Sequence, residues 1–173
     1  MSGPGFGSWY SEFMTDFAKS WRLSRQRFVD SVADLNQDQL NYRLHDGVLT
    51  IGEMALHVAG VEIWFVAQLT GQELNQAEIK LTQAAVNGVV NEKPFPYSAD
   101  EIAPPMVTWA MGRAEGYVQK NIEEPTEEFL TKEIQSALGP IITGEGALTR
   151  FAFHPAYHQG QVHLIRTSPG FPA

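Results

Sequence analysis

Two histidines in this chain are spaced so that they could bind one metal ion. His154 and His158 lie four residues apart in the segment His154-Pro155-Ala156-Tyr157-His158. On an α-helix, residues four apart are separated by about 40° around the axis and by roughly 6 Å along it. Both imidazoles can therefore turn toward one point, where a metal–nitrogen bond has a length of about 2 Å. This spacing predicts a shared divalent ion.

A third histidine, His57, is expected to join the pair from a different helix. It lies among Met54, Val58 and Val61, on the apolar face of that helix. Because an unpaired polar group in a core is costly, each inward imidazole needs a partner. A shared metal would satisfy all three histidines. The alternative is that each is an ordinary core residue, hydrogen-bonded to a backbone carbonyl.

Three neutral imidazoles would leave the ion its full positive charge and an open coordination position, which is typical of a catalytic site. We expect zinc or nickel, although nitrogen ligands also suit iron, copper and manganese. A zinc-protease motif is excluded, because Pro155 stands where that motif requires a glutamate as general base. His45 is expected to be solvated, and His163 points about 140° away from His158 around the helix.

Glu53, Tyr157 and Gln161 are the candidates for catalytic or supporting roles. Glu53 lies one turn before His57, where it could act as a base, as a further ligand or as the cap of the helix. Gln161 lies about one turn after His158 and could support that imidazole or simply pack. Tyr157 could face the mouth of the site, with plain surface exposure as the alternative.

Substrate binding would involve further residues. Arg150 lies one turn before His154 and could attract an anionic substrate or cofactor, unless it is an ordinary surface residue. Trp64 or Trp109 could line an aromatic pocket for an electrophile, or belong to the core. Because the chain contains no cysteine, any sulfur nucleophile must come from a cosubstrate.

The composition is that of a single globular domain spanning residues 1–173, of which 1–7 are expected to be flexible. The formal net charge is −8, from 12 basic and 20 acidic residues, and the basic residues form no cluster. Such a surface repels phosphate backbones and anionic lipids, so we expect neither nucleic acid nor a membrane as partner. No signal peptide or membrane-spanning apolar run is apparent, and we expect a cytoplasmic protein.

Hydrophobic residues recurring at steps of three, four and seven predict four long helices. We expect these at about 8–35, 51–70, 104–122 and 144–167. The second should begin with a capping box formed by Thr50 and Glu53 and end at Gly71. A short helix is expected within 73–85, and a helical turn with a strand-like stretch within 125–142. The pattern predicts an all-α four-helix bundle with a long connection between its second and third helices.

Two motifs make the sequence resemble the DinB/YfiT-like metalloprotein superfamily over about residues 8–170. The motifs are Leu40-Asn41-Tyr42-Arg43 with Leu49-Thr50-Ile51-Gly52-Glu53 and His57, and then His154-x-x-x-His158-Gln159-Gly160-Gln161-Val162. The resemblance implies an up-down-down-up bundle, frequent homodimers, and a metal held by His57, His154 and His158. Pro155 departs from the family pattern and should kink the helix, because it removes the amide that would bond to the Phe151 carbonyl.

The resemblance also implies an activity. Members of this family with known activities use low-molecular-weight thiols, among them bacillithiol S-transferases and mycothiol-dependent isomerases. We therefore expect a metal-dependent transferase that activates a small thiol and moves it onto an electrophilic substrate. The alternatives are a metal-dependent hydrolase, a non-catalytic metal- or ligand-binding stress protein, and a plain structural bundle whose histidines belong to the core.

Overall fold

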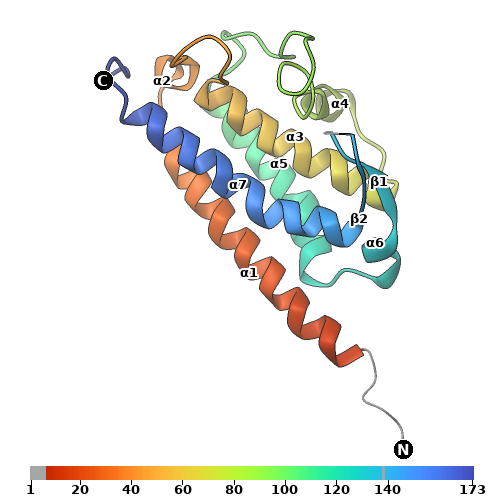
Figure 1. The fold of residues 1–173 in the computed structure, drawn as a ribbon. Coiled ribbons are helices and arrows are strands. Elements are labelled where there is room, and N and C mark those ends of the chain that lie inside the picture. Colours follow the sequence, from red (N-terminus) through yellow and green to blue (C-terminus); the bar gives the residue numbers. More distant parts are fainter. Residues whose placement is uncertain (1–6, 138) are drawn as a thin grey trace, which may run out of the picture.

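The computed structural model describes residues 7–137 and 139–173, with side chains from residue 17 onward. Helices dominate this part of the chain, and one short two-stranded sheet accompanies them, so the expected all-α class is confirmed (Figure 1). The predicted flexible segment 1–7 lies outside the described residues except for Gly7, which begins α1. The elements are α1 (Gly7–Val32), α2 (Gln37–Asn41), α3 (Ile51–Thr70), α4 (Gln76–Gln83), α5 (Pro104–Glu123), α6 (Glu127–Thr131), β1 (Glu133–Gln135), β2 (Ile141–Thr143) and α7 (Gly144–Arg166).

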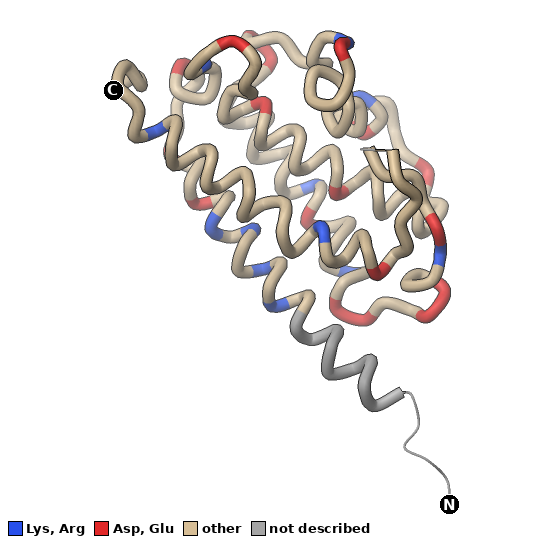
Figure 2. Tube along the Cα trace, in the orientation of Figure 1, with Lys and Arg blue, Asp and Glu red and all other residues tan. Residues whose placement is uncertain are grey.

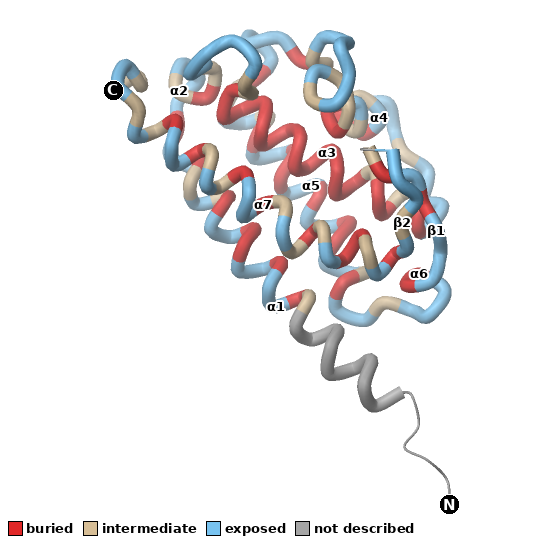
Figure 3. The backbone as a smooth tube through the Cα atoms, viewed as in Figure 1, coloured by how far each residue is buried: buried red, intermediate tan, exposed pale blue. Residues whose placement is uncertain are grey.

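The long helices α1, α3, α5 and α7 pack against one another. The most extensive contacts join α1 to α7 and α3 to α5, and further contacts join α1 to α5 and α3 to α7. Of the 20 residues of α3, 16 are buried, so this helix forms the centre of the core (Figure 3). A helix with apolar residues on all sides is typically buried, because exposing any of its faces to water would be unfavourable. Among the described residues, no helix is both long and apolar enough to cross a bilayer.

Both ends of α3 lie where the sequence predicts them. The side chain of Thr50 accepts a hydrogen bond from the amide of Glu53, and the Glu53 carboxylate accepts one from the amide of Thr50 at 2.8 Å. This reciprocal capping box satisfies two amides that the helix itself leaves without partners. At the other end, Gly71 adopts a left-handed conformation with φ of 70°, which a glycine reaches without steric cost.

The segment between α1 and α3 differs from its prediction. Helix α1 ends at Val32, three residues before the expected Leu35, and the supposed polar link contains α2. The side chain of Asn36 accepts from the amide of Gln39 at 3.0 Å, and the Gln39 side chain accepts from the amide of Asn36 at 2.9 Å. This second capping box starts a new helix, with Asn36 as an N-cap in an extended conformation. The chain therefore leaves α1 before the expected Leu35.

The predicted helical turn and strand-like stretch are α6 and the hairpin of β1 and β2. The two strands are antiparallel, with Glu133 opposite Thr143. Thr143 then caps α7, because its hydroxyl accepts a hydrogen bond from the amide of Gly146 at 3.3 Å. The hairpin therefore leads directly into the helix that carries two of the candidate ligands.

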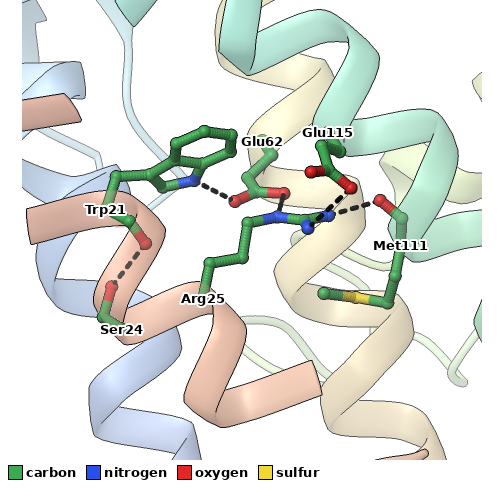
Figure 4. Close-up of polar contacts among 6 residues, drawn as sticks. All are labelled: Trp21, Ser24, Arg25, Glu62, Met111 and Glu115. Atoms are coloured by element: carbon green, nitrogen blue, oxygen red, sulfur yellow. Dashed lines mark hydrogen bonds and ion pairs between the residues drawn. The ribbon is translucent and has the colours of Figure 1, made fainter. Parts of the chain in front are cut away.

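A buried polar network ties α1 to α3 and α5 (Figure 4). Glu62 of α3 is 1% exposed and accepts hydrogen bonds from Trp21 Nε1 at 2.9 Å and from Arg25 Nε at 3.3 Å. Arg25 also donates to the carbonyl of Met111 and lies 3.4 Å from Glu115 on α5. Burial raises the pKa of Glu62, although the nearby Arg25 and Trp21 oppose that shift. The network fixes how the three helices align, since a buried charge must keep its partners.

Candidate metal centre

The structure brings together the three histidines that the sequence singles out. His57 comes from α3, whereas His154 and His158 come from α7. Nε2 of His154 lies 3.1 Å from Nε2 of His57 and 3.0 Å from Nε2 of His158. The ligand atoms of the three residues all lie within 4.8 Å of one another, so the group could hold one metal ion. His45 and His163 are exposed and belong to no such group.

Hydrogen bonds at Nδ1 fix the protonation of two of these imidazoles. Nδ1 of His57 lies 2.9 Å from the carbonyl oxygen of Ala84, and Nδ1 of His158 lies 2.7 Å from Oε1 of Gln161. Because both oxygens only accept hydrogen bonds, each Nδ1 must carry the hydrogen. In the neutral ring, Nε2 is then left with a lone pair. Gln161 itself is anchored, since its Nε2 donates to the hydroxyl of Tyr157 at 3.3 Å.

The resulting donor set fits a divalent ion. Lone pairs on His57 and His158 both lie beside Nε2 of His154, which carries at most one hydrogen and can satisfy only one of them. A cation can accept lone pairs from all three nitrogens. Zinc–nitrogen bonds of 2.0–2.1 Å in a tetrahedral arrangement would separate the nitrogens by about 3.3 Å. The two separations from Nε2 of His154, 3.1 Å to His57 and 3.0 Å to His158, are close to this value.

The surroundings of the three imidazoles keep them uncharged. Burial lowers the pKa of His57, and burial together with the two neighbouring imidazoles lowers the pKa of His154 well below its ordinary value. Burial lowers the pKa of His158 to about 4, with a smaller contribution from His57, although the hydrogen bond to Gln161 opposes the shift. Because metals bind the deprotonated ring, protons compete weakly for this site at neutral pH.

Pro155 does not separate the two ligands of α7. The helix is continuous from Gly144 to Arg166, and the proline is buried within it. His154 and His158, on either side of the proline, still meet with their rings 4.6 Å apart. The predicted loss of one amide donor therefore leaves this pair convergent.

A cavity of about 1220 Å³ opens beside the three histidines. Its walls come from α3, α7 and the loops at 43–49 and 85–95. The volume exceeds the roughly 300–1,000 Å³ of ordinary small-molecule sites, and the three histidines are among the lining residues, so the cavity can seat a small molecule beside the imidazoles. Four of the residues predicted to support the site line this cavity: Glu53, Arg150, Tyr157 and Gln161.

Glu53 is fully engaged as a structural residue. One carboxylate oxygen accepts from the amide of Thr50, and the other lies 2.7 Å from Nη2 of Arg43. Of the roles considered for Glu53, these contacts therefore support that of helix cap. Arg43 was not singled out from the sequence, although it follows Tyr42 in the first family motif.

Of the two alternatives considered for Trp64 and Trp109, lining of the pocket is not the one that the structure supports. Trp64 packs against the core and Trp109 is 39% exposed on α5, and neither lines the cavity. The aromatic walls are instead Phe65, Phe95 and Phe153. Two of these come from a loop or an exposed helix position, where hydrophobic periodicity carries no information.

Comparisons with known proteins place the chain in a family. No curated protein matches its sequence. Among solved structures, a conserved protein from Enterococcus faecalis is similar with a TM-score of 0.62 and 13% sequence identity, covering 86% of this chain and 92% of that one. At this identity the likeness shows a shared fold alone. The sequence model of the DinB superfamily matches residues 20–162. Because that match spans most of the sequence and includes all three histidines, the chain belongs to the DinB superfamily.

Proposed function

We propose that this protein is a metal-dependent transferase that moves a low-molecular-weight thiol onto an electrophilic substrate. The observation that carries the proposal is the convergence of three uncharged imidazole nitrogens at the wall of a large cavity. When bound, a divalent ion supplies a Lewis acid that lowers the pKa of a thiol toward neutrality. The chain's own contribution is to hold the ligands neutral and oriented and to admit two reactants.

The residues that would hold the ion are His57, His154 and His158, and the expected metal is zinc or nickel. Ala84 and Gln161 each receive a hydrogen bond from the far side of an imidazole ring, which directs the Nε2 lone pair inward. Such outer contacts raise ligand basicity and fix ring orientation in metal sites generally. We assign Gln161 a positioning role for this reason.

The use of a thiol is supported by three considerations. The chain has no cysteine, so a sulfur nucleophile has to enter from outside. The cavity is large enough to seat a thiol and an electrophile together. Finally, the DinB motifs of this sequence resemble those of thiol-dependent enzymes.

We further propose that α1, α3, α5 and α7 form a four-helix bundle in up-down-down-up order. Two contacts support this arrangement. The guanidinium of Arg166 lies 2.9 Å from Asp34, which joins the end of α7 to the end of α1. Asn41 donates to the carbonyl of Ile102 at 2.9 Å, which joins α2, just before α3, to the start of α5. These contacts support parallel directions for α1 with α7 and for α3 with α5.

The test of the proposed activity uses untagged protein. We expect elemental analysis to find a divalent metal, and a spectrophotometric assay to find conjugation of a biological thiol to a chromogenic electrophile. The rate should collapse on chelation, return when metal is added, and be retained in His163→Ala. Absence of metal from the untagged protein would refute the metal site. If the metal is present but no thiol perturbs the spectrum of the cobalt-substituted protein, the transferase proposal fails.

A further inference from the structure

Among the charged residues around the cavity, basic residues outnumber acidic ones, although the whole chain carries a net charge of −8. Three arginine and lysine residues line the cavity, and Glu53 is the one acidic residue among its described lining. Arg43 pairs with Glu53, so these two charges cancel. Within the described part of the chain, neither Lys93 nor Arg150 forms an ion pair. The cavity therefore presents two uncompensated positive charges.

Of these two cations, Arg150 lies on the helix that carries His154 and His158, one turn before His154. Its side chain is half-buried, and Nη1 donates to the carbonyl of Gly146 at 3.0 Å. This bond uses one of the roughly five donors of a guanidinium and leaves the others for a ligand. Residues 151–165 of α7 contain no Asp, Glu, Lys or Arg, and the middle of this helix is accordingly tan in Figure 2. Along the sequence of α7, Arg150 is therefore the charged residue nearest to His154. Lys93 is exposed on a loop.

Apolar side chains cover much of the remaining wall. Phe65 and Phe95 line the cavity, as do Phe153 and Leu164, which are 63% and 65% exposed. Phe153 also lies against Tyr157, with ring centroids 5.9 Å apart. Covering this exposed apolar surface with a ligand is favourable, because the apolar side chains are then removed from water.

We propose that this cavity binds an amphipathic organic carboxylate, whose carboxylate pairs with Arg150 and whose apolar body covers the phenylalanine walls. The inference rests on the proposed function, since it names the substrate class of the same cavity. A small inorganic anion would leave the apolar walls in water, and an uncharged apolar ligand would leave the guanidinium without a charged partner. A guanidinium matches the planar geometry of a carboxylate, with which it forms paired hydrogen bonds.

The position of Arg150 also sets where the reactive group of such a ligand lies. Its Cα is one helical turn, roughly 6 Å, from that of His154. Because Nη1 of Arg150 donates to the carbonyl of Gly146, two turns before His154, a ligand held by Arg150 has to extend toward the C-terminal end of α7 to reach the imidazoles. Arg150 acts as a specificity-determining residue in this arrangement.

Calorimetric titration with three matched probes tests the inference. Phenylbutyrate, phenylbutanol and phenylbutylamine share an apolar body and differ in charge. We expect the acid to bind at least about tenfold more tightly than the alcohol, as a charge-assisted hydrogen bond provides, and the amine to bind most weakly. Arg150→Met should remove the preference for the acid without changing the affinity for the alcohol, and Arg150→Lys should restore part of it. Arg27→Met, which makes the same charge change at an exposed position of α1, is the matched control.

Each titration is made with metal-bearing and with chelator-treated protein, after circular dichroism has shown that the variants fold. The preference for the acid should be present in both forms. Equal affinities for acid and alcohol, or a preference that survives in Arg150→Met, would overturn the inference. So would a preference confined to the metal-bearing form, because the ion would then bind the carboxylate. The proposed transferase activity can fail its own assay while this preference remains, so the two failures are distinguishable.

Discussion

At the scale of single residues, the metal centre depends on which ring nitrogen of each histidine carries the hydrogen. His57 and His158 each donate from Nδ1, to a backbone carbonyl in one case and to a side-chain amide in the other. Within the described part of the chain, Nδ1 of His154 makes no such outer hydrogen bond; its Nε2 lies between the other two rings. Outer hydrogen bonds thus orient the imidazoles of His57 and His158, and the imidazole of His154 completes the site between them.

Removal of a ligand should therefore abolish tight metal binding. We expect His57→Ala, His154→Ala and His158→Ala each to lower the affinity for the metal by more than about tenfold, since loss of an outer contact alone has that effect. Metal content after dialysis, measured by mass spectrometry, gives the comparison. His45→Ala and His163→Ala, at exposed positions, should retain the wild-type content. A full complement of metal in His158→Ala would contradict the three-ligand site.

The positioning role of Gln161 gives a separate prediction. Gln161→Leu should weaken metal binding by about 10–100-fold, because Nδ1 of His158 loses its acceptor and the ring its fixed orientation. Competition with a chromogenic chelator measures this affinity. Gln159→Leu makes the same chemical change at a neighbouring half-buried position and should have little effect. Equal losses in both variants would show that Gln161 only packs.

The sequence reveals the three histidines, because helical periodicity places His154 and His158 on one face and His57 on an apolar face. It does not reveal Ala84 or Arg43. Ala84 acts through its backbone carbonyl, which every residue has. Arg43 reaches Glu53 because of the path that its loop takes. Both contacts depend on tertiary structure that no local pattern encodes.

At the scale of elements, α3 and α4 approach so closely that α3 requires a glycine, Gly60, at the point of contact. A Cβ on Gly60 would lie 2.5 Å from the carbonyl oxygen of Leu81 and 3.2 Å from the amide of Ala85. Both atoms belong to the backbone of the segment that also carries the Ala84 carbonyl. Spacing between these helices therefore bears directly on the orientation of His57.

We predict that Gly60→Ala destabilises the protein by about 1–3 kcal/mol, because α4 must move to accommodate the methyl group. Thermal unfolding followed by circular dichroism measures the change. Gly112→Ala on α5 is the control, since nothing lies within 4 Å of a Cβ there and alanine is the better helix former. That variant should be more stable by roughly 0.5–1 kcal/mol. Equal effects of the two substitutions would contradict the close approach of α3 and α4.

Element boundaries were predictable where a cap and a hydrophobic pattern coincide. Thr50 with Glu53, and Gly71 at the other end, define α3 in the sequence and in the structure. Helix α2 was missed although Asn36 and Gln39 have the spacing of a capping box. Five residues are too few to show a helical period, so the cap was the sole local signal.

At the scale of the whole molecule, burial of three imidazoles makes the metal-free fold sensitive to acid. The ordinary pKa of 6.5 for His158 falls to about 4 in the folded chain. Above pH 6.5 the group is neutral in both states and its titration does not affect stability. As the pH falls from 6.5 toward about 4, the unfolded chain binds a proton that the folded chain does not, so the folded state is progressively destabilised.

We predict a loss of stability on the order of 3 kcal/mol from this group across that window. Urea unfolding of chelator-treated protein at several pH values measures it. His158→Gln removes the titrating group, and its stability should depend less steeply on pH. If the wild type and this variant show the same pH dependence, His158 does not have a lowered pKa.

The carbonyl of Ala84 shapes how this protein can change during evolution. Any amino acid at position 84 would offer the same oxygen to His57, so selection for the contact leaves no mark on residue identity beyond a limit on size. Substitutions along the exposed face of α4 can accumulate without disturbing it. A single inserted or deleted residue between 72 and 83 would move the carbonyl at position 84 and break its hydrogen bond to His57. The exposed face of this segment is therefore free to drift in sequence while the segment remains fixed in length.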